Sequence, residues 1–269
     1  MPGTGKWGRC VPIAVAICTS VAAADRNGTH VPKVVPPLPI VTTVLNAAGY
    51  EAVIAPGSWV MIQGENLANT TRMWRNSDFN GDDLPTQIDG VSATIDGLPA
   101  FIEYVSPTQI NVQAPSDNNI GLLTVVVANN GVSSPPVYVQ MQQFSPALFT
   151  VGNYAIASVV PGNMPVTAAT PAKPGDLVAL LATGFGPTIP SVPAGLVVSG
   201  APITTTPPVV WIDGLPVHVD SAILVAGTAG VYQITIRIPD TAPIGAVSVT
   251  ATLGGAITQP GAVLYVGAP

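Results

Sequence analysis

The sequence predicts an all-β protein built from two tandem immunoglobulin-like β-sandwich domains. Three observations support this prediction. One ordered set of phrases occurs twice along the chain, apolar and polar residues alternate with the period of a strand, and 27 glycines and 29 prolines separate short apolar runs. No stretch carries an amphipathic helical stripe of useful length, which excludes the helical and mixed fold classes.

The internal repeat predicts the domain organisation. The second copy follows the first at an offset near 118 residues, which is about the length of one sandwich domain. The repeated phrases are PGSWVMI at 56–62 with PGDLVAL at 174–180, IDGLP at 95–99 and again at 212–216, and QINVQAP at 109–115 with QITIRIP at 233–239.

Strand periodicity is clear within each copy. Val91, Ala93 and Ile95 alternate with Ser92 and Thr94, so one face of this segment is apolar and the other is polar. The pattern favours strands that bury one face in a sandwich core.

Dipeptides with a strong turn preference lie between these segments. Asp96-Gly97 and Asp213-Gly214 predict two-residue type I′ hairpins, because both central residues of that turn need a positive φ. Asn129-Asn130-Gly131 and Gly254-Gly255 predict the next hairpin of each copy.

The N-terminus predicts export. Lys6 and Arg9 precede an apolar run at 11–21 that ends in three alanines, which is the order of a cleavable signal peptide with a cut before Asp25. The run is too short for a stable membrane span, and acylation of Cys18 is the alternative use of this segment. The predicted segments are a signal peptide at 1–24, a Pro-rich spacer at 25–44, and sandwiches at 45–146 and 147–269.

The charge of the chain limits the kinds of partner that it can bind, and its cysteine content limits disulfide formation. The chain has only 8 Lys and Arg residues and a net charge of −6, which argues against a nucleic-acid partner. Cys10 and Cys18 both lie in the predicted signal peptide, so no disulfide is expected after cleavage.

Several phrases resemble a family of uncharacterised bacterial exported proteins with paired C-terminal immunoglobulin-like domains of the IPT/TIG type. The resemblance implies this fold and export, and it brings no catalytic residue. It also implies that FSPALFT is the link between the two halves. The phrases are PGSWVMIQGENLA at 56–68, LPTQIDGVSATIDG at 84–97, YVSPTQINVQA at 104–114, FSPALFT at 144–150 and PAKPGDLVALLATGFGP at 171–187.

The sequence contains no recognisable catalytic set. Its two histidines are His30, in the spacer, and His218, which aligns with the apolar Phe101 of the first copy. Glu103 and Asp220 occupy matching places in different copies, and there is no nucleophile elbow, phosphate-binding loop or metal-ligand motif. We therefore expect no enzyme activity and no cofactor.

The loop at 69–83 is the predicted place for function. Trp74, flanked by Arg72 and Arg75, is expected to be exposed and to be a candidate ligand contact, with folding back onto the sheet as the alternative. Trp59 and Trp211 are expected in a core or a domain junction.

The acidic part of the same loop has two interpretations. Asp78, Asn80 and Asp82 have the alternating spacing of a calcium loop, but the residues expected for its glycine and bidentate glutamate are absent. A solvated loop with Asx turns is the other interpretation.

The resulting hypothesis is a non-enzymatic binding or adhesion module of the bacterial cell surface, periplasm or medium. Its partner would be an envelope or extracellular protein or a polysaccharide. A passive structural spacer and a polysaccharide hydrolase are the alternatives.

Overall fold

The computed structural model describes residues 37–269, which form one compact unit. Strands and their connections make up this part of the chain, with one short 3-10 helix, η1, as the only helical element that it contains. The predicted signal peptide, Cys10, Cys18 and His30 lie outside the described residues. The first strand begins at Ile40, so the last residues of the predicted spacer lie in a strand.

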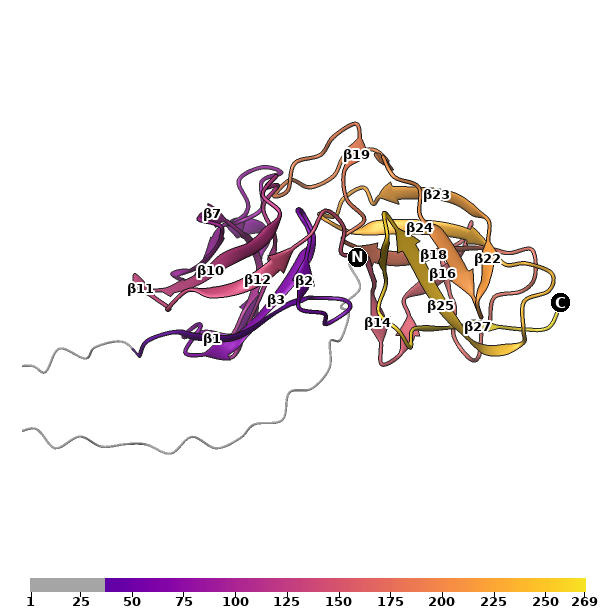
Figure 1. Ribbon diagram of the computed structural model, residues 1–269, viewed down its shortest axis with the longest axis horizontal. Helices are drawn as coiled ribbons and strands as arrows, with labels where there is room; N and C mark the ends of the chain where they lie inside the picture. The colour runs from indigo at the N-terminus through magenta and orange to yellow at the C-terminus, as the bar shows by residue number, and fades with distance from the viewer. Residues whose placement is uncertain (1–36) are drawn as a thin grey trace, which may run out of the picture. The chain divides into compact units, whose positions relative to one another are not determined.

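The elements up to Met141 form the first sandwich. They are β1 (Ile40–Asn46), β2 (Val53–Ile54), β3 (Trp59–Glu65), β4 (Arg72–Met73), η1 (Asn76–Asp78), β5 (Gln87–Ile88), β6 (Val91–Ile95), β7 (Leu98–Pro99), β8 (Phe101–Val105), β9 (Gln109–Gln113), β10 (Gly121–Asn129), β11 (Val132–Ser133) and β12 (Val137–Met141). One sheet has the order β1-β3-β9-β8-β4, and the other has the order β2-β12-β10-β6-β5 with β7 and β11 at its margins. Figure 1 shows these strands in indigo to magenta.

The elements from Ala147 onward form the second sandwich. They are β13 (Ala147–Leu148), β14 (Thr150–Val151), β15 (Tyr154–Ala155), β16 (Ala157–Val160), β17 (Met164–Pro165), β18 (Leu177–Thr183), β19 (Thr188–Ile189), β20 (Ile203–Thr204), β21 (Val209–Ile212), β22 (Leu215–Val217), β23 (Val219–Leu224), β24 (Tyr232–Arg237), β25 (Gly245–Leu253), β26 (Ala256–Ile257) and β27 (Val263–Val266). The sheets have the orders β17-β16-β18-β24-β23-β20-β19 and β14-β15-β27-β25-β21-β22.

The two sandwiches repeat one pairing scheme. The pairs β3–β9 and β8–β9 of the first correspond to β18–β24 and β23–β24 of the second. Most strand pairs are antiparallel, and each sandwich also contains one parallel pair, β2–β12 in the first and β15–β27 in the second. The all-β prediction of two tandem immunoglobulin-like sandwiches is confirmed.

The predicted hairpins have the geometry that their sequences require. Asp96 and Gly97 have φ values of 52° and 77°, and Asp213 and Gly214 have 47° and 77°. The flanking residues pair directly, Ile95 with Leu98 and Ile212 with Leu215, which leaves two-residue type I′ turns. The turns at Asn130-Gly131 and Gly254-Gly255 also have positive φ at both positions.

Each sandwich has its own apolar core. In β6 the side chains of Val91, Ala93 and Ile95 are buried, whereas Ser92 and Thr94 are partly exposed, as the alternation predicts. The first core lies between β3, β9, β6 and β10, and the second between β18, β24, β21 and β25. A hydrophobic core of this kind supplies most of the stability of a domain without disulfides.

Residues 142–146 connect the sandwiches and are held on both sides. Phe144 is buried in the second core, and Ser145 donates a hydrogen bond to the carbonyl of Val53 at 2.8 Å. The Asn46 amide donates to the carbonyl of Ser145 at 2.8 Å. The segment at 144–150 that the resemblance implied as the link begins in this connection and continues through β13 to the first residue of β14.

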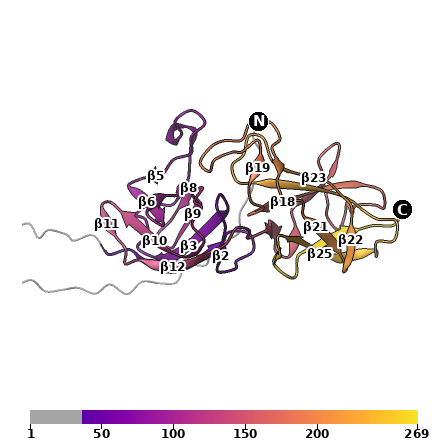
Figure 2. The same ribbon diagram turned by 45° about the horizontal axis from the view of Figure 1, so that its top comes forward.

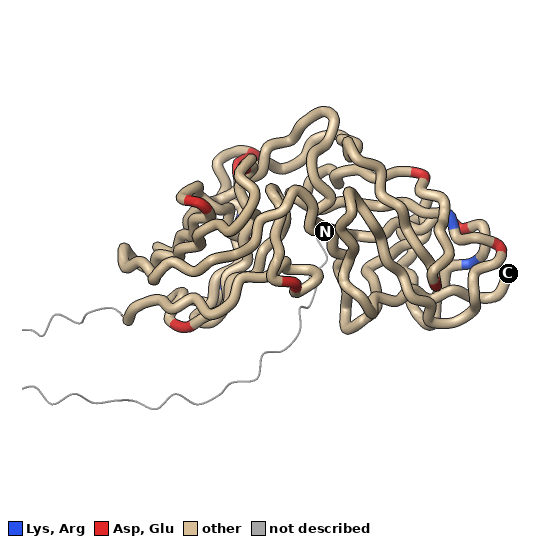
Figure 3. The backbone as a smooth tube through the Cα atoms, in the orientation of Figure 1, with Lys and Arg blue, Asp and Glu red and all other residues tan. Residues whose placement is uncertain are grey.

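Charged residues are sparse along the described backbone, as Figure 3 shows. In residues 37–269 no helix is long and apolar enough to cross a membrane.

Candidate ligand-binding groove

An aromatic cluster joins the two sandwiches, and we call it the junction cluster. Trp59, at the start of β3, is buried with Leu84 and Ala229. The partly buried members of the junction cluster are Ala47, Trp74, Phe79, Phe101, Phe149, Val197 and Val231. Because these residues come from both halves of the chain, the cluster acts as a small third core between the sandwiches.

Trp59 makes the central polar contacts of the junction. Its indole Nε1–H donates to the carbonyl of Ala229 at 2.7 Å, and its backbone N–H donates to the Thr183 hydroxyl oxygen at 3.0 Å. The Thr183 hydroxyl in turn donates to the carbonyl of Gly230 at 2.9 Å. All these groups are buried, so their mutual hydrogen bonds remove the cost of unpaired polar atoms.

The loop of residues 225–231 exists only in the second copy. Residues 106–108 alone connect β8 to β9, whereas residues 225–231 connect the equivalent strands β23 and β24. This longer connection supplies Ala229, Gly230 and Val231 to the junction. The two repeats therefore differ where the second contacts the first.

A second pair of loops interlocks at the junction. The N–H of Leu84 donates to the carbonyl of Gly195 at 2.8 Å, and the N–H of Val197 donates to the carbonyl of Asp82 at 2.9 Å. Asp83 and Leu196 lie opposite each other in an antiparallel bridge. In Figure 2 the purple segment before β5 extends beyond the sheets of its own sandwich. The main chain of this segment thus pairs with the main chain of the other sandwich.

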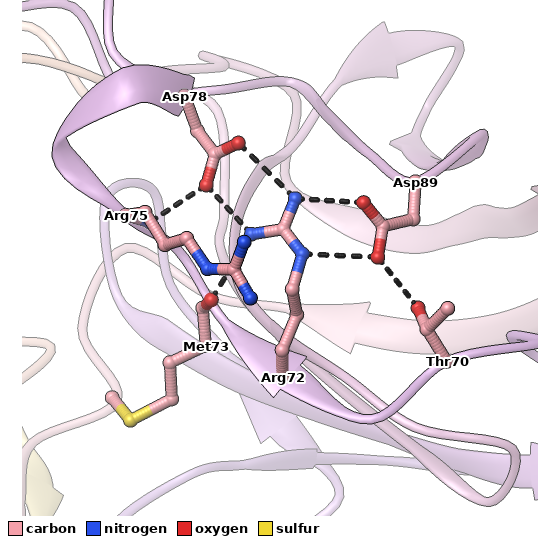
Figure 4. A network of polar contacts seen from close by, with 6 residues as sticks. All are labelled: Thr70, Arg72, Met73, Arg75, Asp78 and Asp89. Atoms are coloured by element: carbon pink, nitrogen blue, oxygen red, sulfur yellow. Dashed lines mark hydrogen bonds and ion pairs between the residues drawn. The ribbon is translucent and has the colours of Figure 1, made fainter.

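An ion-pair network fixes the base of the loop at 69–83 (Figure 4). Arg72 contacts Asp78 at 2.7 Å and Asp89 at 2.8 Å, and the Thr70 hydroxyl donates to Asp89. Hydrogen bonds from Arg72 and Thr70 lower the pKa of Asp89 to about 2, and hydrogen bonding to Arg72 lowers the pKa of Asp78 as well. The network orders the loop that carries Trp74 and Phe79.

The prediction that Trp74 is exposed was wrong. Its ring is half-buried and contacts Trp59 and Phe79 edge-on, with centroids 5.8 and 5.0 Å apart. The ring therefore folds back into the junction cluster. Arg72 is engaged by two carboxylates, whereas Arg75 is exposed beside them.

Asp78 is oriented away from a calcium-loop arrangement. Its carboxylate accepts hydrogen bonds from the Arg72 guanidinium and from the Arg75 backbone N–H, the latter at 2.6 Å. Asn80 and Asp83 close a tight turn through mutual backbone hydrogen bonds. Within residues 37–269, no group of three or more His, Cys, Asp or Glu side chains is placed to hold a metal ion.

The prediction that Trp211 lies in a core or a domain junction was also wrong. Trp211 lies on the outward face of β21, partly exposed, and its indole N–H reaches the Thr252 hydroxyl at 3.4 Å. It belongs to neither core nor to the junction cluster.

A groove of about 470 Å³ opens beside the junction cluster, and we call it the junction groove. Both sandwiches line it. Its polar side chains are Gln113, Ser116, Asp117, Asn118, Gln143, Thr188 and Ser191, and its apolar side chains include Pro56, Ile120, Pro187, Val192, Pro193 and Leu196. Its size is within the range of small-molecule sites.

Side chains of the first sandwich hold the main chain of residues 194–195 of the second sandwich in place beside the junction groove. The N–H of Gly195 donates to Gln113 Oε1 at 2.9 Å, and the N–H of Ala194 donates to Ser116 Oγ at 2.7 Å. Tyr232, which also lines the groove, donates a hydrogen bond from its hydroxyl to the carbonyl of Gly186, and burial raises the pKa of its phenol. The groove is therefore formed before any ligand arrives.

Asp117 has one carboxylate oxygen without a hydrogen-bond partner. Its Oδ1 accepts from the backbone N–H of Asn119 at 3.0 Å, whereas its Oδ2 is buried and unpaired. Such an atom is uncommon in a folded protein, because a buried acceptor without a donor destabilises the fold.

A shallower groove in the second sandwich contains His218. Asp220, Ser221 and Thr204 also line it, with a volume of about 400 Å³. Asp220 forms an ion pair with Arg237 at 3.5 Å, and the described contacts include no hydrogen bond among His218, Asp220 and Ser221. The residues are brought together without the hydrogen-bonded relay of a hydrolase.

Little in the sequence indicates the junction groove. The residues of its polar wall stand in ordinary strand and turn positions, and Asp117 lies in a short polar stretch, SDNN, like many solvated loops. The one available signal was the longer connection before Gln233 in the second copy, which marks a departure from the repeat.

Comparison with known proteins supports the fold. Residues 49–151 match the IPT/TIG domain family, so the predicted domain type is confirmed for the first sandwich. No curated protein matches the chain in sequence.

Solved structures with a similar strand arrangement share little sequence. A surface glycan-binding protein of Prevotella bryantii is 11% identical, with a TM-score of 0.27 over 83% of this chain and 41% of that one. The SGBP-B protein of a Bacteroides ovatus mixed-linkage glucan utilization locus, solved with a heptasaccharide, is 12% identical, with a TM-score of 0.35 over 81% and 44%. Domains 5–6 of the S-layer protein SbsC are 12% identical, with a TM-score of 0.26 over 86% and 99%. The chain spans less than half the length of the first two proteins.

Proposed function

We propose that this protein is an exported, non-enzymatic binding module that holds its ligand in the junction groove. The observation that carries the proposal is a groove whose walls come from both sandwiches and whose loops are fixed by direct hydrogen bonds. A preformed site binds more tightly than a flexible one, because little conformational entropy is lost on binding. The partner would be an envelope or extracellular polysaccharide or protein.

The chemistry of the described residues fits binding better than catalysis. Glu103 and Asp220 lie in different sandwiches, and neither lines the junction groove. The lining contains a single carboxylate, Asp117, among amides, hydroxyls and apolar side chains. Such a lining can orient a ligand through hydrogen bonds, whereas glycoside hydrolysis requires a pair of carboxylates.

The proposal of export rests on the predicted signal peptide at 1–24. It is tested by expressing the full chain in a Gram-negative host and sequencing the N-terminus of the protein found outside the cytoplasm. A mature chain that begins at Asp25 is expected, and a full-length chain confined to the cytoplasm would contradict export.

The binding function is tested with a variant that fills the junction groove. Ser191 is exposed and lines the groove, so Ser191→Trp is expected to block it without disturbing either core. Ser199→Trp places the same ring at an exposed position outside the lining and serves as the control. The readout is binding to a glycan array and to solubilised envelope fractions.

The expected result is a ligand that the wild type and Ser199→Trp bind and that Ser191→Trp binds at least about tenfold more weakly. The second candidate function, a passive spacer, is favoured by the continuous junction cluster, which makes the two sandwiches one stiff unit. The spacer predicts equal behaviour of all three proteins, and that outcome would refute the binding proposal.

A further inference from the structure

We propose that the outward face of the sheet β14-β15-β27-β25-β21-β22 binds a neutral polysaccharide chain. We call this surface the aromatic face, and the residues that define it are Tyr154, Trp211, Asp213 and Tyr265. None of these four residues lines the junction groove, so the aromatic face is a second binding site. The inference goes beyond the proposed function, and each site can be tested without the other.

Three aromatic side chains reach the solvent on the aromatic face. Trp211 in β21 and Tyr265 in β27 are partly exposed, and Tyr154 in β15 is 40% exposed. The residues on either side of Trp211 and of Tyr265 are buried. Because the side chains of a strand alternate between its two faces, both rings lie on the side of the sheet away from the core.

The rings have fixed orientations. Tyr154 and Tyr265 stack with their centroids 4.8 Å apart and an interplanar angle of 15°, and the Tyr265 hydroxyl donates to the Tyr154 hydroxyl oxygen at 2.8 Å. The indole N–H of Trp211 reaches Thr252 of the neighbouring strand β25, so this ring leans over β25. Side chains that are already ordered lose little conformational entropy when a ligand binds.

The two aromatic groups are separated by more than the length of one sugar. On the outward side of β25, Trp211 pairs with Thr250, and Tyr265 pairs with Ala246 from the opposite edge. Four residues along a strand and two strand spacings place the backbones of Trp211 and Tyr265 about 16 Å apart. The rings can therefore contact different units of one polysaccharide chain.

An exposed carboxylate lies between the two aromatic groups. Asp213, in the turn after β21, accepts hydrogen bonds through Oδ1 from the backbone N–H and the hydroxyl of Ser248, both at 3.0 Å. Ser248 stands midway between Ala246 and Thr250 on the outward side of β25. Sugar hydroxyls donate charge-assisted hydrogen bonds to a carboxylate, and the faces of aromatic rings attract the C–H groups on the apolar side of a sugar.

The first sandwich indicates that the fold does not require these aromatic residues. From the repeat and its strand pairing, Trp211 corresponds to Thr94 and Tyr265 corresponds to Gln140. The same kind of sheet therefore forms with small or polar side chains at these positions. A role in binding accounts for aromatic residues that the packing of the sheet does not need.

The charge of the aromatic face favours a neutral ligand. Strands β21, β25 and β27 contain no Lys or Arg, and Asp213 adds a negative charge. An acidic polysaccharide would meet this carboxylate without a cation to pair with it. The formal net charge of −6 also repels acidic polymers from a distance.

A second copy of the chain fits the aromatic face less well. In a two-fold symmetric dimer the same patch of both copies meets itself, so two Asp213 carboxylates would enter one interface. The strands of the face supply no cation to pair with them, and like charges brought together weaken an interface.

The test is electrophoresis of the full-length mature protein through native gels that contain a dissolved polysaccharide. The neutral probes are hydroxyethylcellulose, galactomannan and pullulan. Carboxymethylcellulose has the same backbone as hydroxyethylcellulose and carries acidic groups. We expect at least one neutral polymer to retard the protein, and we expect no retardation by carboxymethylcellulose.

The variants exchange residues between the repeats. Trp211→Thr and Tyr265→Gln introduce the residues of the first sandwich, and each is expected to weaken binding at least about tenfold. Tyr138→Val is the control, because it removes an exposed tyrosine from the corresponding face of the first sandwich and introduces the residue of the second. It is expected to bind like the wild type. Equal melting temperatures establish that the variants fold.

The junction-groove variant distinguishes the two sites. Binding that Ser191→Trp keeps and Trp211→Thr loses supports the aromatic face. Binding that Ser191→Trp loses and Trp211→Thr keeps would overturn this inference and support the proposed function.

Other outcomes also overturn the inference. These are no retardation by any neutral probe, equal retardation by carboxymethylcellulose, and unchanged binding in both Trp211→Thr and Tyr265→Gln. A wild-type dimer in sedimentation velocity that Trp211→Thr converts to a monomer would assign the face to a second copy of the chain instead.

Discussion

At the residue scale, Glu103 and Asp220 show how one position diverged between the repeats. Each lies at a register shift in its strand, between Ile102 and Tyr104 in β8 and between Val219 and Ser221 in β23. Asp220 has Arg237 at 3.5 Å, whereas Glu103 accepts only a 3.4 Å hydrogen bond from the Asn111 amide. Burial raises the pKa of Glu103 despite that hydrogen bond.

This pKa predicts the pH dependence of Glu103→Gln. Because the pKa is raised in the folded state, the folded protein holds more protons than the unfolded one above the ordinary value of 4.5. The contribution of Glu103 to stability is therefore greatest below that value and decreases as pH rises through the folded pKa. We expect Glu103→Gln to raise the urea midpoint at pH 7 relative to the wild type, with a smaller difference at pH 4.

The measurement is urea denaturation followed by fluorescence across this pH range. Glu65→Gln, at an exposed site in β3, removes the same charge and is the control. An unchanged urea midpoint of Glu103→Gln at pH 7 would contradict this prediction. It would mean that the Glu103 carboxylate has stronger hydrogen bonds than the one from Asn111.

Individual side-chain environments were the least predictable part of the sequence. Trp74 stands between two arginines in a polar loop, a pattern typical of an exposed residue. Its burial depends on Trp59 and Phe79 and on a loop more than a hundred residues later in the chain. No local pattern contains that information.

At the element scale, turns and strands followed local sequence closely. The Asp-Gly and Asn-Gly dipeptides gave the predicted hairpins because few residue pairs tolerate two positive φ values. The alternation in β6 gave the buried face because side chains of a strand point to opposite sides. The interlocked loops at 82–84 and 195–197 have no such period and could not be predicted.

Comparing alanine substitutions at two turn glycines distinguishes the cost of backbone strain from the cost of disturbing contacts at the junction. Gly97 and Gly195 have φ values of 77° and 86°, so alanine at either position is strained by about 1 kcal/mol. A Cβ at Gly97 would meet no atom within 4 Å, whereas one at Gly195 would clash with the ring of Phe101. We expect Gly195→Ala to lower stability by about 1–3 kcal/mol more than Gly97→Ala does.

Chemical denaturation of the two alanine variants side by side measures this difference. Equal losses would mean that the loop at 193–197 moves freely enough to release Phe101. The hydrogen bonds of Ala194 and Gly195 would then not hold this wall of the junction groove in place.

At the scale of the whole molecule, three apolar clusters make the repeats interdependent. The junction cluster lies between the two sandwich cores and shares Trp74 with the first. The repeat in the sequence predicted two domains, and it did not predict how firmly they are joined. The two sandwiches are joined firmly because the longer loop at 225–231 and the interlocking loops at 82–84 and 195–197 make contacts between them.

This coupling predicts a single unfolding transition for the wild type in differential scanning calorimetry. Trp59→Ala removes a buried indole and its hydrogen bond to Ala229, which should cost about 3–5 kcal/mol and uncouple the sandwiches into two transitions. Trp211→Ala, which removes the partly exposed indole of β21, should leave one transition. Two transitions already present in the wild type would mean that the junction cluster contributes little.

The short connection at residues 142–146 has a consequence for proteolysis. Its side chains are anchored in both halves, so it lacks the several free residues that a protease needs to draw a linker into its active site. Cleavage between the repeats by a peptidase would have to wait for one half to unfold. The two halves would therefore share one lifetime, and a stable half-length fragment should not accumulate.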